Sequence, residues 1–106
     1  MNLSITYDTA TCSQADHSII YGLGTALNPI TASGGACSIG NSSPYTWNGT
    51  PVLAAGQFIW FVIVGDAGTT ESSWGQKYVS GTYSERSASA SNQCGNTVIN
   101  TTGTCP

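Results

Sequence analysis

The run FIWFVIV at residues 58–64 constrains the fold of this chain more than any other feature. All seven residues are apolar, and each is either aromatic or β-branched. Such residues favour strands, and a run this short fits a strand buried on both faces better than a helix. It also falls well short of the ~18 residues of a membrane-spanning helix. We therefore expect a central β-strand here.

The remaining sequence predicts more strands and no helix, because no segment shows a sustained helical period with caps. Short β-type runs between Gly, Pro, Asn and Ser clusters are typical of an all-β domain. Asn48-Gly49 predicts a type I′ hairpin turn between residues 45–47 and 52–53, with Pro51 confining the second arm to a sheet edge. At 106 residues, the chain is expected to form one domain, 1–106, with a small antiparallel sheet or sandwich. The other expected strands are residues 3–7, 17–21, 36–39, 77–83 and 97–99.

Four cysteines, Cys12, Cys37, Cys94 and Cys105, are widely spaced and form no C-x-x-C motif. Zinc and c-type haem signatures are therefore absent, and the pattern predicts two disulfides and an oxidising compartment. Three pairings are possible, and chain entropy does not choose among them. We expect Cys12–Cys37 and Cys94–Cys105, because these cysteines are neighbours in sequence and the C-terminal segment resembles a closed end.

Charge is scarce in this chain, at 7% of residues, and Lys77 and Arg86 are the only cations in a net charge of −3. Binding to nucleic acid or to an anionic membrane surface needs clustered Lys and Arg, so both partner classes are excluded. Soluble domains usually carry about a quarter or more charged residues on their surface. The deficit favours an extracellular domain, or one largely covered in an assembly.

No catalytic or metal-binding constellation stands out in the sequence. His17 follows Asp16, but neighbours on a strand point to opposite faces, so we expect a surface or half-buried strand histidine rather than a base. The acids Asp66, Glu71 and Glu85 match neither a glycosidase pair nor an EF-hand loop. We expect no enzyme, metal, cofactor or small-molecule substrate, with calcium bound by loop oxygens as the weaker alternative.

Structural roles are expected for the remaining distinctive side chains. In a chain so poor in charge, Arg86 is expected to clamp a carboxylate, and Glu71 is the expected partner of this ion pair. Trp60 is expected in the core because of its strand position. Trp47 and Trp74 lie near loops, so we expect them at a partner-binding face. A sugar-stacking platform formed by the three tryptophans and the five tyrosines is the alternative.

Three motifs carry a resemblance to a known family: T-E-S-S-W-G at residues 70–75, E-R at 85–86, and N-Q-C-G…G-T-C-P over 92–106. With L-S-I-T-Y-D-T-A-T-C near the start, they resemble the globular C-terminal region of long type IVa pilins from metal-reducing bacteria. In some of these bacteria, a short chain supplies the N-terminal helix and a separate chain supplies the β-rich head. This chain resembles that separate head.

The resemblance implies a structural subunit of an extracellular or cell-surface filament, exported through the periplasm. Its implied partners are a short N-terminal helical pilin chain and further copies of itself. Similar W-G…E-R loops occur in fibronectin-III-like modules of secreted bacterial proteins, so a module that binds carbohydrate or a surface protein is the alternative. The residues expected to contact the partner are Phe58, Trp60, Val62 and Val64, together with Trp47 and Trp74.

Overall fold

The computed structural model describes residues 2–24 and 30–102, which form nine β-strands and no helix. The expected small all-β fold with a disulfide is therefore confirmed. None of the described residues forms a helix long and apolar enough to cross a membrane. The strands are β1 (Leu3–Ile5), β2 (Asp16–Gly24), β3 (Gly34–Ala36), β4 (Tyr45–Trp47), β5 (Phe58–Ala67), β6 (Thr70–Ser72), β7 (Gln76–Val79), β8 (Thr82–Glu85) and β9 (Val98–Asn100).

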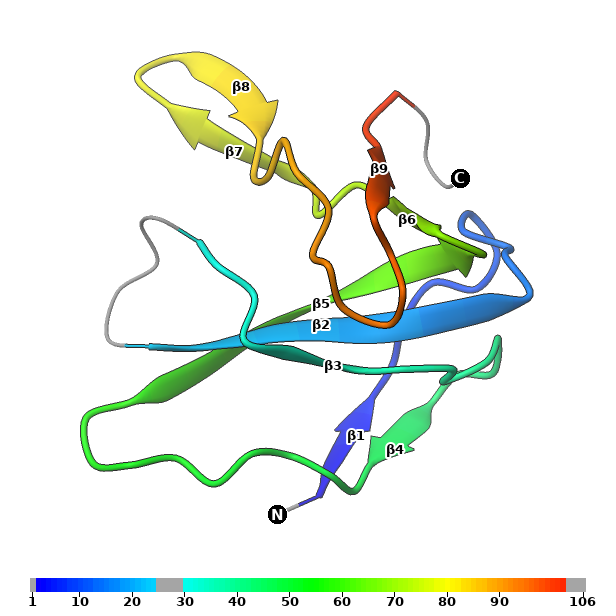
Figure 1. Cartoon of the computed structure of the whole chain (residues 1–106), viewed down its shortest axis with the longest axis vertical. Helices are drawn as coiled ribbons and strands as arrows, with labels where there is room; N and C mark the ends of the chain where they lie inside the picture. The colour runs from blue at the N-terminus through cyan, green and yellow to red at the C-terminus, as the bar shows by residue number, and fades with distance from the viewer. Residues whose placement is uncertain (1, 25–29, 103–106) are drawn as a thin grey trace.

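A five-stranded sheet with the order β3-β2-β5-β6-β9 forms the body of the domain. Its long strands β2 and β5 run antiparallel, paired from Asp16–Asp66 to Gly24–Phe58 (Figure 1). Strand β9 pairs parallel to β6 and closes one edge of the sheet, as expected for residues 97–99. The apolar run of residues 58–64 is thus the central strand that its residue types predicted.

Both faces of the β2–β5 pair carry a hydrophobic core, because successive side chains of a strand point to opposite faces. Ile19 packs on one face with residues of β1 and β4, including Ile5 and Trp47. Ile20 packs on the other face with Val64, Trp74 and half-buried residues of neighbouring segments. The expectation that residues 58–64 are buried on both faces holds fully only at Val64, because Phe61 is 38% exposed and the other five residues are half-buried.

Close packing between the two long strands depends on a glycine at position 22. Gly22 lies directly opposite Trp60 in the β2–β5 register. A Cβ added at Gly22 would lie 2.4 Å from atoms of the Trp60 indole, so the ring occupies the space that any other residue would need. Trp60 then reaches Trp74, with 5.6 Å between the ring centroids.

One expected turn and one expected strand differ from the structure. The Asn48-Gly49 hairpin is not formed: β4 pairs with β1 instead, because Trp47 is buried against Ile5 and Ile19 on the sheet. The single strand expected over residues 77–83 is divided into β7 and β8, which form a separate two-stranded hairpin. Its two-residue turn, Ser80-Gly81, has positive φ at both positions, as a type I′ turn requires.

Candidate functional site

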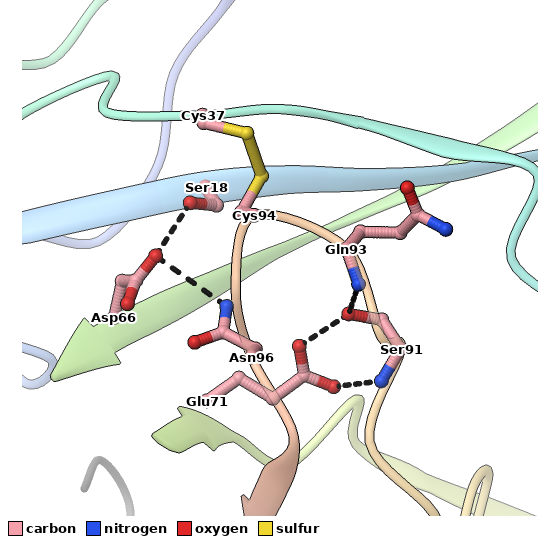
Figure 2. Close-up of a disulfide and its surroundings, with 8 residues drawn as sticks. All are labelled: Ser18, Cys37, Asp66, Glu71, Ser91, Gln93, Cys94 and Asn96. Atoms are coloured by element: carbon pink, nitrogen blue, oxygen red, sulfur yellow. Dashed lines mark hydrogen bonds between the residues drawn. A yellow bond between two sulfur atoms is a disulfide. The ribbon is translucent and has the colours of Figure 1, made fainter. Parts of the chain in front are cut away.

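A disulfide joins Cys37, next to β3, to Cys94 in the loop before β9, with 5.4 Å between their Cα atoms (Figure 2). Both expected pairings, Cys12–Cys37 and Cys94–Cys105, are therefore wrong, and Cys105 lies outside the described residues. The pairing follows from tertiary packing, because the loop of residues 91–97 crosses the sheet where β3 flanks β2. Closeness in sequence carries no information about that contact.

Glu71, on β6, is fully buried beneath the same loop. Its carboxylate accepts hydrogen bonds from the Trp74 Nε1–H at 3.0 Å, the Ser91 backbone N–H at 2.7 Å and the Ser91 hydroxyl at 2.6 Å. Hydrogen bonds to a carboxylate are stronger than neutral ones, and they offset the cost of burying this group. Glu71 therefore fastens the loop to the sheet.

The expected ion pair between Glu71 and Arg86 is not formed in the part of the chain that the structure describes. All donors to Glu71 are neutral, and Trp74 reaches it because it follows only three residues later. Arg86 lies instead at the base of the β7–β8 hairpin, where its backbone N–H donates to the Gly75 carbonyl at 2.9 Å. Its side chain is exposed.

Asp66 completes this polar cluster from the end of β5, directly opposite Glu71 in the β5–β6 register. It accepts a hydrogen bond from the Ser18 hydroxyl at 2.8 Å and a longer one from Asn96 Nδ2 at 3.4 Å (Figure 2). The buried Oδ1 of Asn96 has no hydrogen-bond partner. Through these hydrogen bonds, the cluster holds the loop against the sheet.

His17 is 1% exposed, which corrects the expectation of a surface or half-buried histidine. Its Nδ1 lies 2.8 Å from the Gly40 carbonyl oxygen and its Nε2 lies 2.9 Å from the Cys12 carbonyl oxygen. A carbonyl oxygen only accepts, so both hydrogen bonds exist together only when both ring nitrogens carry a proton. Each nitrogen is engaged with the backbone, and neither is positioned to activate a serine.

Described residues line at least two surface cavities. One, of about 250 Å³, is lined by Tyr7, Asp8, Thr11, Cys12, His17, Ile63, Ser72 and Ser73. The other, of about 340 Å³, lies between residues 30–32 and 87–92 beside Trp74. Over residues 2–24 and 30–102, no group of three or more His, Cys, Asp or Glu side chains is arranged to hold a metal ion.

The residues expected at a partner interface are largely internal. Val64, Trp47 and Trp74 are buried, which corrects their assignment to a contact face. Phe58, Trp60 and Val62 are half-buried. Proximity to loops misled the prediction for the two tryptophans, because each side chain turns inward onto the central sheet.

The β7–β8 hairpin carries the most exposed large apolar side chains of any strand pair described. Tyr78, Val79 and Tyr83 are 62%, 58% and 68% exposed. The two tyrosines lie directly opposite each other, with ring centroids 4.9 Å apart. Figure 1 shows that the hairpin projects from the body of the domain, and among the described residues it pairs with no strand outside itself.

The strand expected over residues 77–83 did not predict this exposed hairpin, although the sequence carries a hairpin pattern there. Two runs with β propensity, residues 76–79 and 82–85, flank a two-residue Ser-Gly pair, which is a hairpin pattern. Lys77 and Arg86, the only cations of the chain, belong to the hairpin and to its base. The hairpin is the candidate interaction site of this domain.

In comparisons with protein-family models, curated proteins and solved structures, none matched this chain.

Proposed function

We propose that this chain is a non-catalytic extracellular domain that works by binding another molecule, with the β7–β8 hairpin as its contact element. The observation that carries this proposal is the exposure of Tyr78, Val79 and Tyr83 on a hairpin that stands apart from the core. Tyrosine is enriched at protein interfaces because its ring is apolar and its hydroxyl is polar. The Cys37–Cys94 disulfide is consistent with an oxidising location.

The geometry favours the module form of this proposal, a fibronectin-III-like binding domain for a carbohydrate or a surface protein. Both faces of the β2–β5 pair are covered among the described residues, by β1 and β4 on one side and by Trp74 and its neighbours on the other. A domain with a closed core and a projecting arm needs no second chain to complete its fold. Its binding surface is then the arm.

The filament form is the second candidate: a pilin head that docks on a short N-terminal helical chain and on further copies of itself. Its supporting observation is the half-buried row of Phe58, Trp60 and Val62 on one side of β5. These side chains keep part of their apolar area available to a helix. The low charge of the chain also suits a subunit that is largely covered in an assembly.

A matched pair of variants tests the proposal. Tyr78→Ser with Tyr83→Ser removes the aromatic arm, whereas Val52→Ser changes an apolar side chain that is 96% exposed in a loop. Each protein is applied to a glycan array and co-expressed with a short helical pilin chain, with filaments scored by electron microscopy. We expect the tyrosine variant to lose the binding that the unmodified chain and Val52→Ser retain. Unchanged binding by the tyrosine variant in both assays would refute the role of the hairpin.

The same experiment separates the two forms. Binding to a glycan without co-purification of the helical chain supports the module. A stoichiometric complex that forms filaments, and that Trp60→Leu weakens more than the tyrosine variant does, supports the pilin head.

A further inference from the structure

The β7–β8 hairpin and Arg86, which directly follows it, together have a net positive charge, opposite to that of the rest of the chain. Lys77 lies in β7 and Arg86 directly follows β8, and both side chains are exposed. Besides Glu85 at the end of β8, the other charged residues of the chain are four acids. Because Glu85 offsets one of the two cations, the hairpin together with Arg86 is weakly basic, whereas the rest of the domain is acidic.

The lining of the cavity of about 250 Å³ combines one acid, Asp8, with polar and apolar side chains. Asp8 is exposed there, and its Oδ1 accepts the backbone N–H groups of Ala10 and Thr11, each at 2.9 Å. The backbone N–H and the hydroxyl of Thr11, followed by the Ala10 N–H, lower the pKa of Asp8 below its usual value. Tyr7 and Ile63 provide the apolar part of the lining.

The arm and the cavity adjoin each other through Ser73. This residue lines the cavity, and its hydroxyl donates a hydrogen bond to the carboxylate of Glu85 at the end of β8. The arm thus leaves the domain beside the cavity, so both belong to one surface. When one surface carries two complementary elements, two copies of the chain can pair about a twofold axis. Each element of one copy then contacts the other element of the second copy.

We propose that the β7–β8 hairpin of one copy docks on the Asp8 cavity of a second copy, and that the reverse contact forms at the same time. This inference rests on the proposed role of the hairpin and names a partner for the face opposite to that of Tyr78 and Tyr83. Lys77 and Val79 share one face of β7 because they are two residues apart. Lys77 pairs with Asp8 of the second copy, and Val79 packs against its Tyr7 and Ile63.

The charges of Lys77 and Asp8 predict how dimerisation responds to substitution and to salt. An exposed ion pair contributes little alone, but the twofold axis doubles each contact, and reversing one charge replaces attraction by repulsion. We expect Lys77→Glu to weaken dimerisation by about tenfold or more. Raising the salt concentration should weaken it as well, since the charges are exposed.

Sedimentation velocity of the full chain, from 10 µM to 1 mM at low salt, tests the proposal. The variants are Lys77→Glu, Asp8→Asn, which keeps an oxygen for the two N–H groups, and the double swap Lys77→Glu with Asp8→Lys. Val52→Glu is the control for net charge, and circular dichroism checks that each variant folds. We expect a monomer–dimer equilibrium that both single variants weaken, the double swap restores and the control leaves unchanged.

Three results would overturn the proposal: a monomer at every concentration, a dimer that Lys77→Glu and Asp8→Asn leave unchanged, or a double swap that restores nothing. Its failure is distinguishable from failure of the proposed function. A monomeric chain whose tyrosine variant still loses glycan or helical-chain binding would refute self-docking and leave the hairpin as the contact element.

Discussion

Replacing Trp74 tests whether this side chain belongs to the core, as the structure places it, or to a surface. Trp74 is 6% exposed, packs with Ile20 and Val64, and donates to the buried carboxylate of Glu71 at 3.0 Å. Trp74→Phe keeps an aromatic ring but removes the donor, and loss of a hydrogen bond to a charged group costs about 1.5–3 kcal/mol. Trp74→Ala also opens a cavity, and such changes cost about 3–5 kcal/mol.

The free energy of unfolding is measured by urea titration of the oxidised chain, followed by circular dichroism. We expect a loss of about 2 kcal/mol for Trp74→Phe and about 4–5 kcal/mol for Trp74→Ala, which is a large share of the ~5–15 kcal/mol of a typical domain. Tyr78→Ala is the control, and it should cost less than about 1 kcal/mol because the ring is exposed. A loss below about 1 kcal/mol for Trp74→Ala would refute the packing described here.

The remaining predictions concern the core, the loop and the N-terminal turn. Gly22→Ala should cost about 1–3 kcal/mol in urea titrations, because its Cβ would lie 2.4 Å from the Trp60 indole. Arg86→Ala should change the free energy of unfolding by less than about 0.5 kcal/mol, whereas Glu71→Gln should cost about 1.5–3 kcal/mol; equal losses would indicate an ion pair. Replacing Cys37 and Cys94 together by Ala should cost about 4 kcal/mol in thermal unfolding, since the disulfide spans 57 residues, and peptide mapping of the unreduced chain should recover this pair. The lowered pKa of Asp8 stabilises the fold above the pKa of an unfolded aspartate, and this effect is lost as the pH falls through the folded value. The gap in melting temperature between the unmodified chain and Asp8→Ala should therefore be present at pH 7 and close in acid.

Local residue types predicted the elements whose burial they determine. Aromatic and β-branched residues at 58–64 predicted β5, and the pattern around residues 17–21 located β2. The all-β fold with a disulfide followed from turn residues and cysteine count. These features depend on contacts that any half-buried strand makes. They can therefore be predicted from the sequence without knowing which strands lie beside each other.

Partners far apart in sequence could not be predicted in the same way. Asn48-Gly49 is a strong local turn signal, yet the burial of Trp47 against β1 decides the pairing of β4. The Cys37–Cys94 pair depends on a loop that crosses the sheet, which no spacing encodes. Trp74 stands between Ser73 and Gly75 in a polar segment, and its packing on Ile20 and Val64 and its hydrogen bond to Glu71 explain its burial.

The exposed hairpin is the part of the candidate site that sequence reasoning passed over. A run of Tyr, Val and Thr predicts a strand, but it does not say whether the strand joins the sheet or stands alone. In the structure, β7 and β8 pair only with each other. Two-stranded hairpins are marginally stable in water, so this element is expected to gain order from a partner.

Amide hydrogen exchange of the hairpin tests the central claim, that β7–β8 is a contact element and not part of the core, most directly. Exchange at residues 76–79 and 82–85 is compared with that of β2 and β5, at 10 µM and at 1 mM chain. We expect fast exchange of the hairpin amides in dilute solution, slow exchange in β2 and β5, and protection of the hairpin as the chain is concentrated. Hairpin amides that exchange as slowly as those of β2 and β5 in the dilute chain would contradict this claim.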